Sequence, residues 1–372
     1  MSVETPSSPV RQTLGSVQAL RGLAALMVVI FHAAAIWRDH VGSPGRFAGP
    51  WDQGYAGVDL FFVISGFIMV WVAGDVAAGG RAAGRFLWHR VTRIYPLWWV
   101  WCGVMAGYFL LAYGQPASPD IATPGTAWGF LSGSLALWPQ GAFPVLQVGW
   151  TLVFEMAFYA VFAALLLLPP RIRPLALGVW AVLLLIALKA LPPPPNMPGG
   201  WPGVLAHPLC LEFLLGAAVA WVIPRWRDEG WARFLALAGG AALLFWLWRG
   251  LDVADPDFAA ARVLVYGVPA ALLVAALVRA ELDGRLAVAR SLRALGDMSY
   301  SLYLSHFIVL LALKRVLGMV GRLESASALS LVIFALIGTG LSLAIGWASY
   351  RRLERPLLRG SRKLLDRGKV TP

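Results

Sequence analysis

The stretch QALRGLAALMVVIFHAAAIW, residues 18–37, has the length and apolar character of a membrane-crossing helix, yet it contains Arg21 and His32. A spanning helix needs about 20 mostly apolar residues, because the hydrocarbon core of a bilayer is about 30 Å thick. The spacing from Arg21 to His32 is about three helical turns, so both side chains lie on nearly one face, roughly 16 Å apart along the axis. Ionisable groups within a span cost free energy and usually mark function. The stretch therefore predicts a membrane helix that carries functional groups.

The composition of the whole chain agrees with a membrane protein. The 372 residues are 59% hydrophobic and 13% charged, and the mean hydropathy is +0.69. Soluble domains carry about 25% charged residues. The sequence predicts an all-α, polytopic membrane protein with about ten transmembrane helices. The expected spans are residues 17–36, 57–73, 94–113, 149–168, 174–192, 204–223, 233–248, 262–279, 294–313 and 326–349. A further apolar stretch, 126–138, is too short to span and is expected to lie at the membrane interface.

The basic residues are distributed unevenly between the two sides of these spans. Most of the 31 Lys and Arg residues fall in the N-terminal segment, in alternate loops and in the C-terminal segment. Because cytoplasmic loops carry an excess of Lys and Arg, both termini are predicted to be cytoplasmic. The expected organisation is a cytoplasmic tail (1–16), a transmembrane domain (17–350) and a basic cytoplasmic tail (351–372), in a bacterial inner membrane. The net charge of +12 then reflects topology and attraction to anionic membrane lipid, and no nucleic-acid partner is expected.

Several polar residues lie at similar predicted depths within the spans. Glu155 and Asp59 enter from the outer side to about the level of His32, and His306 and Ser301 lie in the ninth span. We expect a shared polar chamber, in which Glu155 lies beside His32, holds its tautomer and stabilises the imidazolium. A purely structural Glu–His pair is the alternative. A metal site made from the four ionisable residues is chemically possible. No short ligand spacing supports it, so no metal is predicted.

A basic stretch, RAAGRFLWHRVTRIYPLWW, begins at Arg81 and leads into the third span. Arg81, Arg85 and His89 fall on one helical stripe, and Arg90 and Arg93 fall on a neighbouring one. One interpretation is a positive-inside anchor that binds lipid phosphate. The other is a clamp for the phosphates of a cytosolic, nucleotide-containing ligand.

Taken together, six pieces in order resemble the membrane acyltransferase-3 family over roughly residues 14 to 358. They are LRGLAALMVVIFH, GVDLFFVISGFIM, RVTRIYPLWW, WTLVFEMAFY, GDMSYSLYLSH and ERP. The length resembles the stand-alone type of the family, which O-acetylates exopolysaccharides and other glycans. The resemblance implies an acyl-CoA co-substrate, most often acetyl-CoA, and no permanently bound cofactor. The acceptor would be a hydroxyl of a glycan, or of another molecule, in the membrane or outside the cytoplasm.

The resemblance also implies roles for individual residues. His32 would be the catalytic histidine, with Arg21 as its motif partner. Arg90 and Arg93 match the arginines associated with the donor, and Glu155 matches the acidic position of the fourth-span motif. The other polar residues of the chamber are expected only to support them: Asp59, Ser301 and His306.

The mechanism expected from these assignments is general-base catalysis by His32, oriented by Glu155, on the acceptor hydroxyl. A covalent acyl-histidine stage is an alternative route. Two other functional classes remain open. A proton-coupled secondary transporter would also place His, Glu and Asp in spans, although no internal repeat is visible. A non-catalytic partner in polysaccharide export would leave His32 and Glu155 dispensable. Nothing in the pattern sets the oligomeric state.

Overall fold

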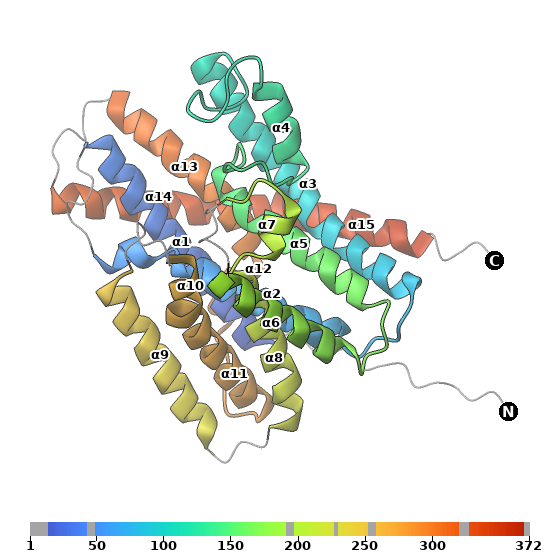
Figure 1. Ribbon diagram of the computed structural model, residues 1–372. Helices are drawn as coiled ribbons and strands as arrows, with labels where there is room; N and C mark the ends of the chain where they lie inside the picture. Colours follow the sequence, from blue (N-terminus) through green and yellow to red (C-terminus); the bar gives the residue numbers. More distant parts are fainter. Residues whose placement is uncertain are drawn as a thin grey trace.

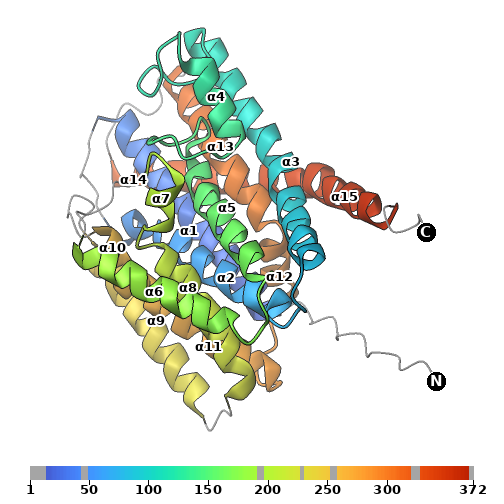
Figure 2. The same cartoon turned by 45° about the vertical axis from the view of Figure 1, so that its right-hand side comes forward.

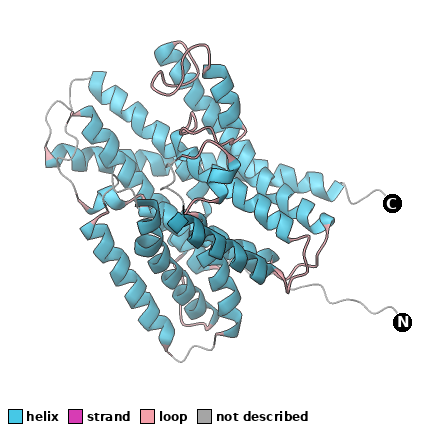
Figure 3. Ribbon diagram, in the orientation of Figure 1, coloured by secondary structure: helices cyan, strands magenta, loops and turns pink. Residues whose placement is uncertain are grey.

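The computed structural model describes residues 14–42, 49–190, 197–226, 230–251, 258–319 and 327–367, with side chains as far as residue 361. These residues form helices joined by turns and short irregular segments, and no strand occurs among them (Figure 3). The all-α prediction is confirmed.

Nine helical stretches in this part of the chain are long and apolar enough to cross a membrane, which makes the protein polytopic. The helices within them are α1 (Gly15–His40), α2 (Ala56–Ala73), α3 (Gly80–Tyr113), α5 (Trp150–Leu165), α6 (Arg173–Ala190), α9 (Trp231–Arg249), α10 (Phe258–Arg262) with α11 (Val268–Leu282), α13 (Ser299–Met319) and α14 (Ala328–Ser349). The remaining helices are α4 (Ala127–Leu135), α7 (Trp201–Leu205), α8 (Cys210–Val222), α12 (Arg290–Asp297) and α15 (Arg355–Arg367). Helix α4 confirms that the stretch 126–138 does not span.

The sixth expected span, 204–223, differs from the prediction. The chain there forms the end of α7, a break at His207 and Pro208, and then α8 with 13 residues. Such a helix is about 20 Å long. Helix α8 packs closely against α2. The approach is so close that a Cβ added to Gly216 would lie 1.9 Å from the Val63 carbonyl oxygen. Glycine at a helix crossing lets two backbones approach, so the sixth run is a short, buried partner of α2.

Helix α3 is much longer than the predicted third span. Its 34 residues extend about 51 Å, well beyond the thickness of the hydrocarbon core. The basic stretch before residue 94, whose arginines were predicted to lie on helical stripes, is therefore the first half of the same continuous helix. Pro96 lies inside it and removes one backbone hydrogen bond.

The C-terminal segment is also helical where the structure describes it. A π-helical turn, Tyr350–Glu354, joins α14 to α15. Figures 1 and 2 show α15 leaving the bundle beside the first half of α3, with which it is in contact. The predicted tail is therefore an ordered extension of the last span as far as Arg367.

The first helix lies in the middle of the bundle, where it contacts α2, α11, α12, α13 and α14 (Figure 1). The Glu281 carboxylate caps its N-terminus from the far end of α11. It accepts hydrogen bonds from the Gly15 and Ser16 amides, at 2.7 and 2.8 Å, and from the Ser16 hydroxyl at 2.5 Å. The first amides of a helix have no intrahelical partner and favour a negative charge. Glu281 therefore holds the end of α1 that carries Arg21.

Candidate functional site

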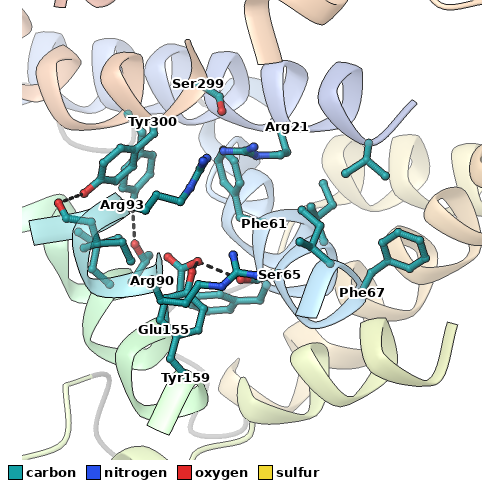
Figure 4. Close-up of a pocket in the computed structure, with 18 of the residues that line it drawn as sticks. Arg21, Phe61, Ser65, Phe67, Arg90, Arg93, Glu155, Tyr159, Ser299 and Tyr300 are labelled. Atoms are coloured by element: carbon teal, nitrogen blue, oxygen red, sulfur yellow. Dashed lines mark hydrogen bonds between the residues drawn. The ribbon is translucent and has the colours of Figure 1, made fainter. Parts of the chain in front are cut away.

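A cavity of 270 Å³ lies between α1, α2, α3, α5 and α13. It brings together four of the predicted site residues: Arg21, Arg90, Arg93 and Glu155. Figure 4 shows the three arginine side chains reaching into this space from α1 and α3. The rest of the wall is mostly apolar and aromatic, and includes Phe61, Phe67, Ile68, Trp71, Tyr300 and Tyr303. Convergent charged groups in a mostly apolar cavity are the usual construction of a ligand site.

Among the described residues, the arginines of the cavity face carboxylates only at longer range: Glu155 lies in the same wall, and Glu354 attracts both Arg21 and Arg93. In the part of the chain that the structure describes, none of them lies in an ion pair. Arg21 donates to Gln18 Oε1 at 3.1 Å, and the Arg90 guanidinium lies over the rings of Phe86 and Tyr159, at 5.2 and 5.3 Å. With three arginines and one carboxylate, Glu155, in its wall, the cavity presents a net positive charge to whatever occupies it.

The basic stretch of α3 is divided between two environments. Arg90 and Arg93 are half-buried and line the cavity, whereas Arg81, Arg85 and His89 are exposed. The two stripes predicted from helical spacing therefore differ in what they face.

Glu155 lies in the cavity wall, but it does not contact His32 as predicted. Its Oε1 accepts a hydrogen bond from Ser65 Oγ at 2.9 Å and another from the Tyr159 hydroxyl. The hydrogen-bonding partners of the His32 ring are the Val28 carbonyl and His306. The expectation rested on depth alone. In the structure Glu155 lies at the level of Arg21, on which its charge acts, and not at the level of His32, which faces α13.

The two histidines of the predicted chamber do meet. His306 Nε2 lies 3.1 Å from His32 Nδ1, and the two rings are tilted by 48° at 5.1 Å. Neither lines the cavity. Tyr303 does, and its ring centroid is 5.8 Å from that of His306. The histidine pair therefore lies directly behind the Tyr303 side of the cavity.

The prediction that Asp59 lies in the polar chamber with His32 is also wrong. Its carboxylate is fully buried and accepts two hydrogen bonds from Arg262, at 3.0 and 2.8 Å. Arg262 also lies over the rings of Tyr55 and Phe258, at 5.1 and 5.5 Å. Asp59 faces α10 because a cation on that helix pairs with it.

Ser301 is likewise directed elsewhere. Its hydroxyl donates to Glu354 Oε2 at 2.6 Å and accepts from Ser349 at 3.3 Å. The Trp101 indole donates to Ser349 at 3.2 Å, which links α3 to the end of α14. Of the three supporting residues that were predicted, only His306 reaches His32.

Three residues that matter for this arrangement were not singled out from the sequence. Arg262 stands at the first position of its predicted span, 262–279. Glu212 is an ionisable residue inside a predicted span, a signal that could have identified it, and it is fully buried. Ser65 carried no signal, since serine is common in membrane helices. No group of three or more His, Cys, Asp or Glu side chains suited to a metal occurs among residues with described positions.

Comparison with known proteins identifies the family. The model of the acyltransferase domain matches residues 14–351. The chain is 33% identical over 322 residues to the exopolysaccharide production protein ExoZ of Rhizobium meliloti (strain 1021), covering 83% of this chain and 91% of that protein. It is 29% identical over 384 residues to the acyltransferase MdmB of Streptomyces mycarofaciens, covering 93% and 92%. No solved structure matches the chain significantly. With a family match over nearly its whole length, the protein is a member of the acyltransferase-3 family.

Proposed function

We propose that this acyltransferase moves an acetyl group from cytosolic acetyl-CoA to a hydroxyl of a glycan at the outer side of the membrane. The observation that carries the proposal is the cavity whose wall holds three arginines against one carboxylate, Glu155, with none of the three arginines in an ion pair among the described residues. Positive charge that is partly removed from water is costly unless an anion compensates it. Coenzyme A carries negatively charged phosphates, and arginine binds phosphate in a bidentate manner.

The geometry of α1 supports a donor that extends from the arginines toward His32. Arg21 lines the cavity, and His32 is about 16 Å farther along the same helix face. The pantetheine arm would lie against the apolar wall that includes Phe61 and Ile68. The thioester would then reach the Tyr303 side of the cavity, behind which the histidines lie.

His32 is proposed as the general base. As the acceptor hydroxyl attacks the thioester carbonyl carbon, its proton passes to His32. The carbon–sulfur bond breaks, the acetyl group remains on the glycan oxygen, and coenzyme A leaves as a thiolate. The proton on His32 then neutralises that thiolate. A thiolate is a good leaving group, so no strong general acid is required.

Glu155 receives a different role from the one predicted for it. It accepts a hydrogen bond from Tyr159, whose ring lies under the Arg90 guanidinium. We propose that Glu155 fixes Tyr159 and so positions Arg90 for the donor phosphates. Glu155 would then act on donor binding and only indirectly on the proton transfer.

The proposal includes an orientation in the membrane. Lys and Arg are concentrated in the N-terminal segment, alternate loops and the C-terminal segment, and this distribution supports a cytoplasmic location for both termini, in the inner membrane. The cavity would open on that side, since Leu14 and Val17 near the start of α1 line it. The exposed Arg81 and Arg85 would contact lipid phosphate there.

Inverted membrane vesicles from the host strain provide the test. With acetyl-CoA labelled in the acetyl group, the wild-type protein should transfer label to the glycan fraction, compared with vesicles that lack the protein. His32→Ala should abolish transfer, whereas His40→Ala, at the end of the same helix, should retain it. No label above the background of vesicles lacking the protein, or full transfer by His32→Ala, would refute the proposal.

A further inference from the structure

The hydrogen bonds of the histidine pair define which ring nitrogens carry protons. A neutral imidazole has one donor nitrogen and one acceptor nitrogen. His306 Nδ1 lies 3.2 Å from the Leu302 carbonyl oxygen. Because a carbonyl can only accept, Nδ1 of His306 carries the proton. Nε2 of His306 is then an acceptor.

The same argument applies to His32. Its Nδ1 lies 3.0 Å from the Val28 carbonyl oxygen and 3.1 Å from His306 Nε2. Both neighbours are acceptors, so Nδ1 carries the proton and shares it between them. Nε2 of His32 therefore keeps its lone pair, which is what a general base needs.

We infer that His306 is the positioning residue for the base, resting on the function proposed above. Together with the Val28 carbonyl it holds His32 in the Nδ1–H tautomer, and its contact from α13 fixes the direction of the Nε2 lone pair toward the acceptor hydroxyl. When Nε2 takes the hydroxyl proton, Nδ1–H remains bonded to His306 and the positive charge of the imidazolium is shared with that acceptor. In hydrolytic triads a carboxylate performs this task. Here a neutral imidazole occupies the place that was predicted for Glu155.

A neutral partner suits the surroundings of the pair. His306 is fully buried, and the rings of Tyr303 and Phe307 lie 5.8 and 6.5 Å from it. An unpaired carboxylate in such a place would carry a large desolvation cost. Two neutral imidazoles orient each other without adding a buried charge in the resting enzyme. The inference follows from the contacts of His306 with α1 and from its own backbone bond, neither of which involves the arginine cavity.

The kinetic test compares two substitutions of His306 that fill similar volumes. Phe keeps a ring but cannot accept a hydrogen bond, whereas the Gln amide oxygen can accept one from His32 Nδ1. His306→Phe should lower kcat for acetyl transfer by roughly 10²–10⁴-fold and leave acetyl-CoA binding by calorimetry unchanged. His306→Gln should recover at least about tenfold of that loss. A folded His306→Phe protein with kcat within about twofold of wild type, or equal losses for Phe and Gln, would overturn the inference.

A spectroscopic test separates this inference from the proposed function, since it needs no turnover. The chain contains five histidines, so ¹⁵N-histidine NMR of the protein in nanodiscs is tractable, with His32→Gln and His306→Gln identifying the two signals. We expect a protonated Nδ1 and an unprotonated Nε2 on His32, with His32 Nδ1 perturbed in His306→Phe. A proton on Nε2 of resting His32 would overturn the inference even if acetyl transfer is confirmed. The expected tautomer without any transfer would instead refute the proposed function alone.

Discussion

Arg262 and the three arginines of the cavity all lie between helices of this protein, and they differ in what faces them. Arg262 is 8% exposed and is held by both oxygens of a fully buried Asp59. Arg21, Arg90 and Arg93 line a cavity without an ion pair among the described residues. The first arrangement satisfies its charges within the protein, so it joins helices. The second leaves its charges for a ligand. The difference teaches that burial of an ionisable group within a span does not by itself mark a binding site; the absence of an internal partner does.

The largest expected effect concerns the paired group. Arg262→Met leaves Asp59 as a buried, unpaired anion, and removing one partner of a buried pair typically costs about 3–5 kcal/mol. We expect a marked fall in the thermal unfolding temperature in detergent. The double variant Asp59→Asn/Arg262→Met removes both charges and should be more stable than the single one. A single variant as stable as the wild type would show that the two arginine groups do not differ in this way.

The next effect concerns the arginines of the cavity. It should appear as weaker binding of acetyl-CoA, with the stability of the protein unchanged. Arg93→Ala removes a guanidinium that would donate hydrogen bonds to the phosphates of acetyl-CoA. A hydrogen bond to a charged group is worth about 1.5–3 kcal/mol. Equilibrium dialysis with labelled acetyl-CoA should show affinity weakened tenfold or more, with Arg93→Lys intermediate because lysine cannot form the bidentate contact. An Arg93→Ala protein that binds as tightly as the wild type would remove Arg93 from the donor site.

A smaller effect tests how the cavity is kept in shape. Glu281→Ala leaves the Gly15 and Ser16 amides without their cap, a change that costs about 1–2 kcal/mol. Thermal unfolding measures it. The matched control is Asp283→Asn, which breaks the i,i+4 pair with Arg279 and should cost less than about 1 kcal/mol. If the control is the more destabilised protein, Glu281 does not anchor α1.

The smallest effect sharpens the role of Glu155. Tyr159→Phe removes the hydroxyl that bonds Glu155 but keeps the ring under Arg90. One hydrogen bond contributes about 1 kcal/mol, so acetyl-CoA affinity should fall by roughly fivefold. Tyr159→Leu also removes the ring and should lose a further 0.5–1 kcal/mol or so. Equal affinities in all three proteins would mean that Tyr159 does not position Arg90.

Much of the fold follows from the length of apolar runs, and the exceptions have physical causes. The run at 204–223 has enough apolar residues to span, but His207 and Pro208 divide it into α7 and α8. The third predicted span began only at residue 94, because the arginines before it are too polar to lie in lipid. Helix formation, however, depends on backbone hydrogen bonds, which continue outside the membrane.

The candidate site was predictable where it depends on one helix and less so where it depends on two. The 90-to-93 spacing correctly placed two arginines on one stripe of α3. Depth alone placed Glu155, Asp59 and His306 near His32, yet only His306 contacts it. For Glu155 the assumed depth was itself wrong, because it lies at the level of Arg21. For Asp59, depth gives only one coordinate of the side chain. The direction in which it points depends on the rotation of each helix about its axis, which is set by packing contacts such as those of Asp59 with Arg262.

The central claim is that the arginines of the cavity, and not the exposed arginines of the same helix, bind the acyl donor. The most direct test is a calorimetric titration of acetyl-CoA into three purified proteins in nanodiscs: the wild type, Arg90→Ala/Arg93→Ala and Arg81→Ala/Arg85→Ala. We predict binding to the wild type, nearly unchanged binding to the Arg81/Arg85 variant, and loss of detectable binding in the Arg90/Arg93 variant. Equal weakening in both variants, or no binding to a folded wild-type protein, would contradict the account.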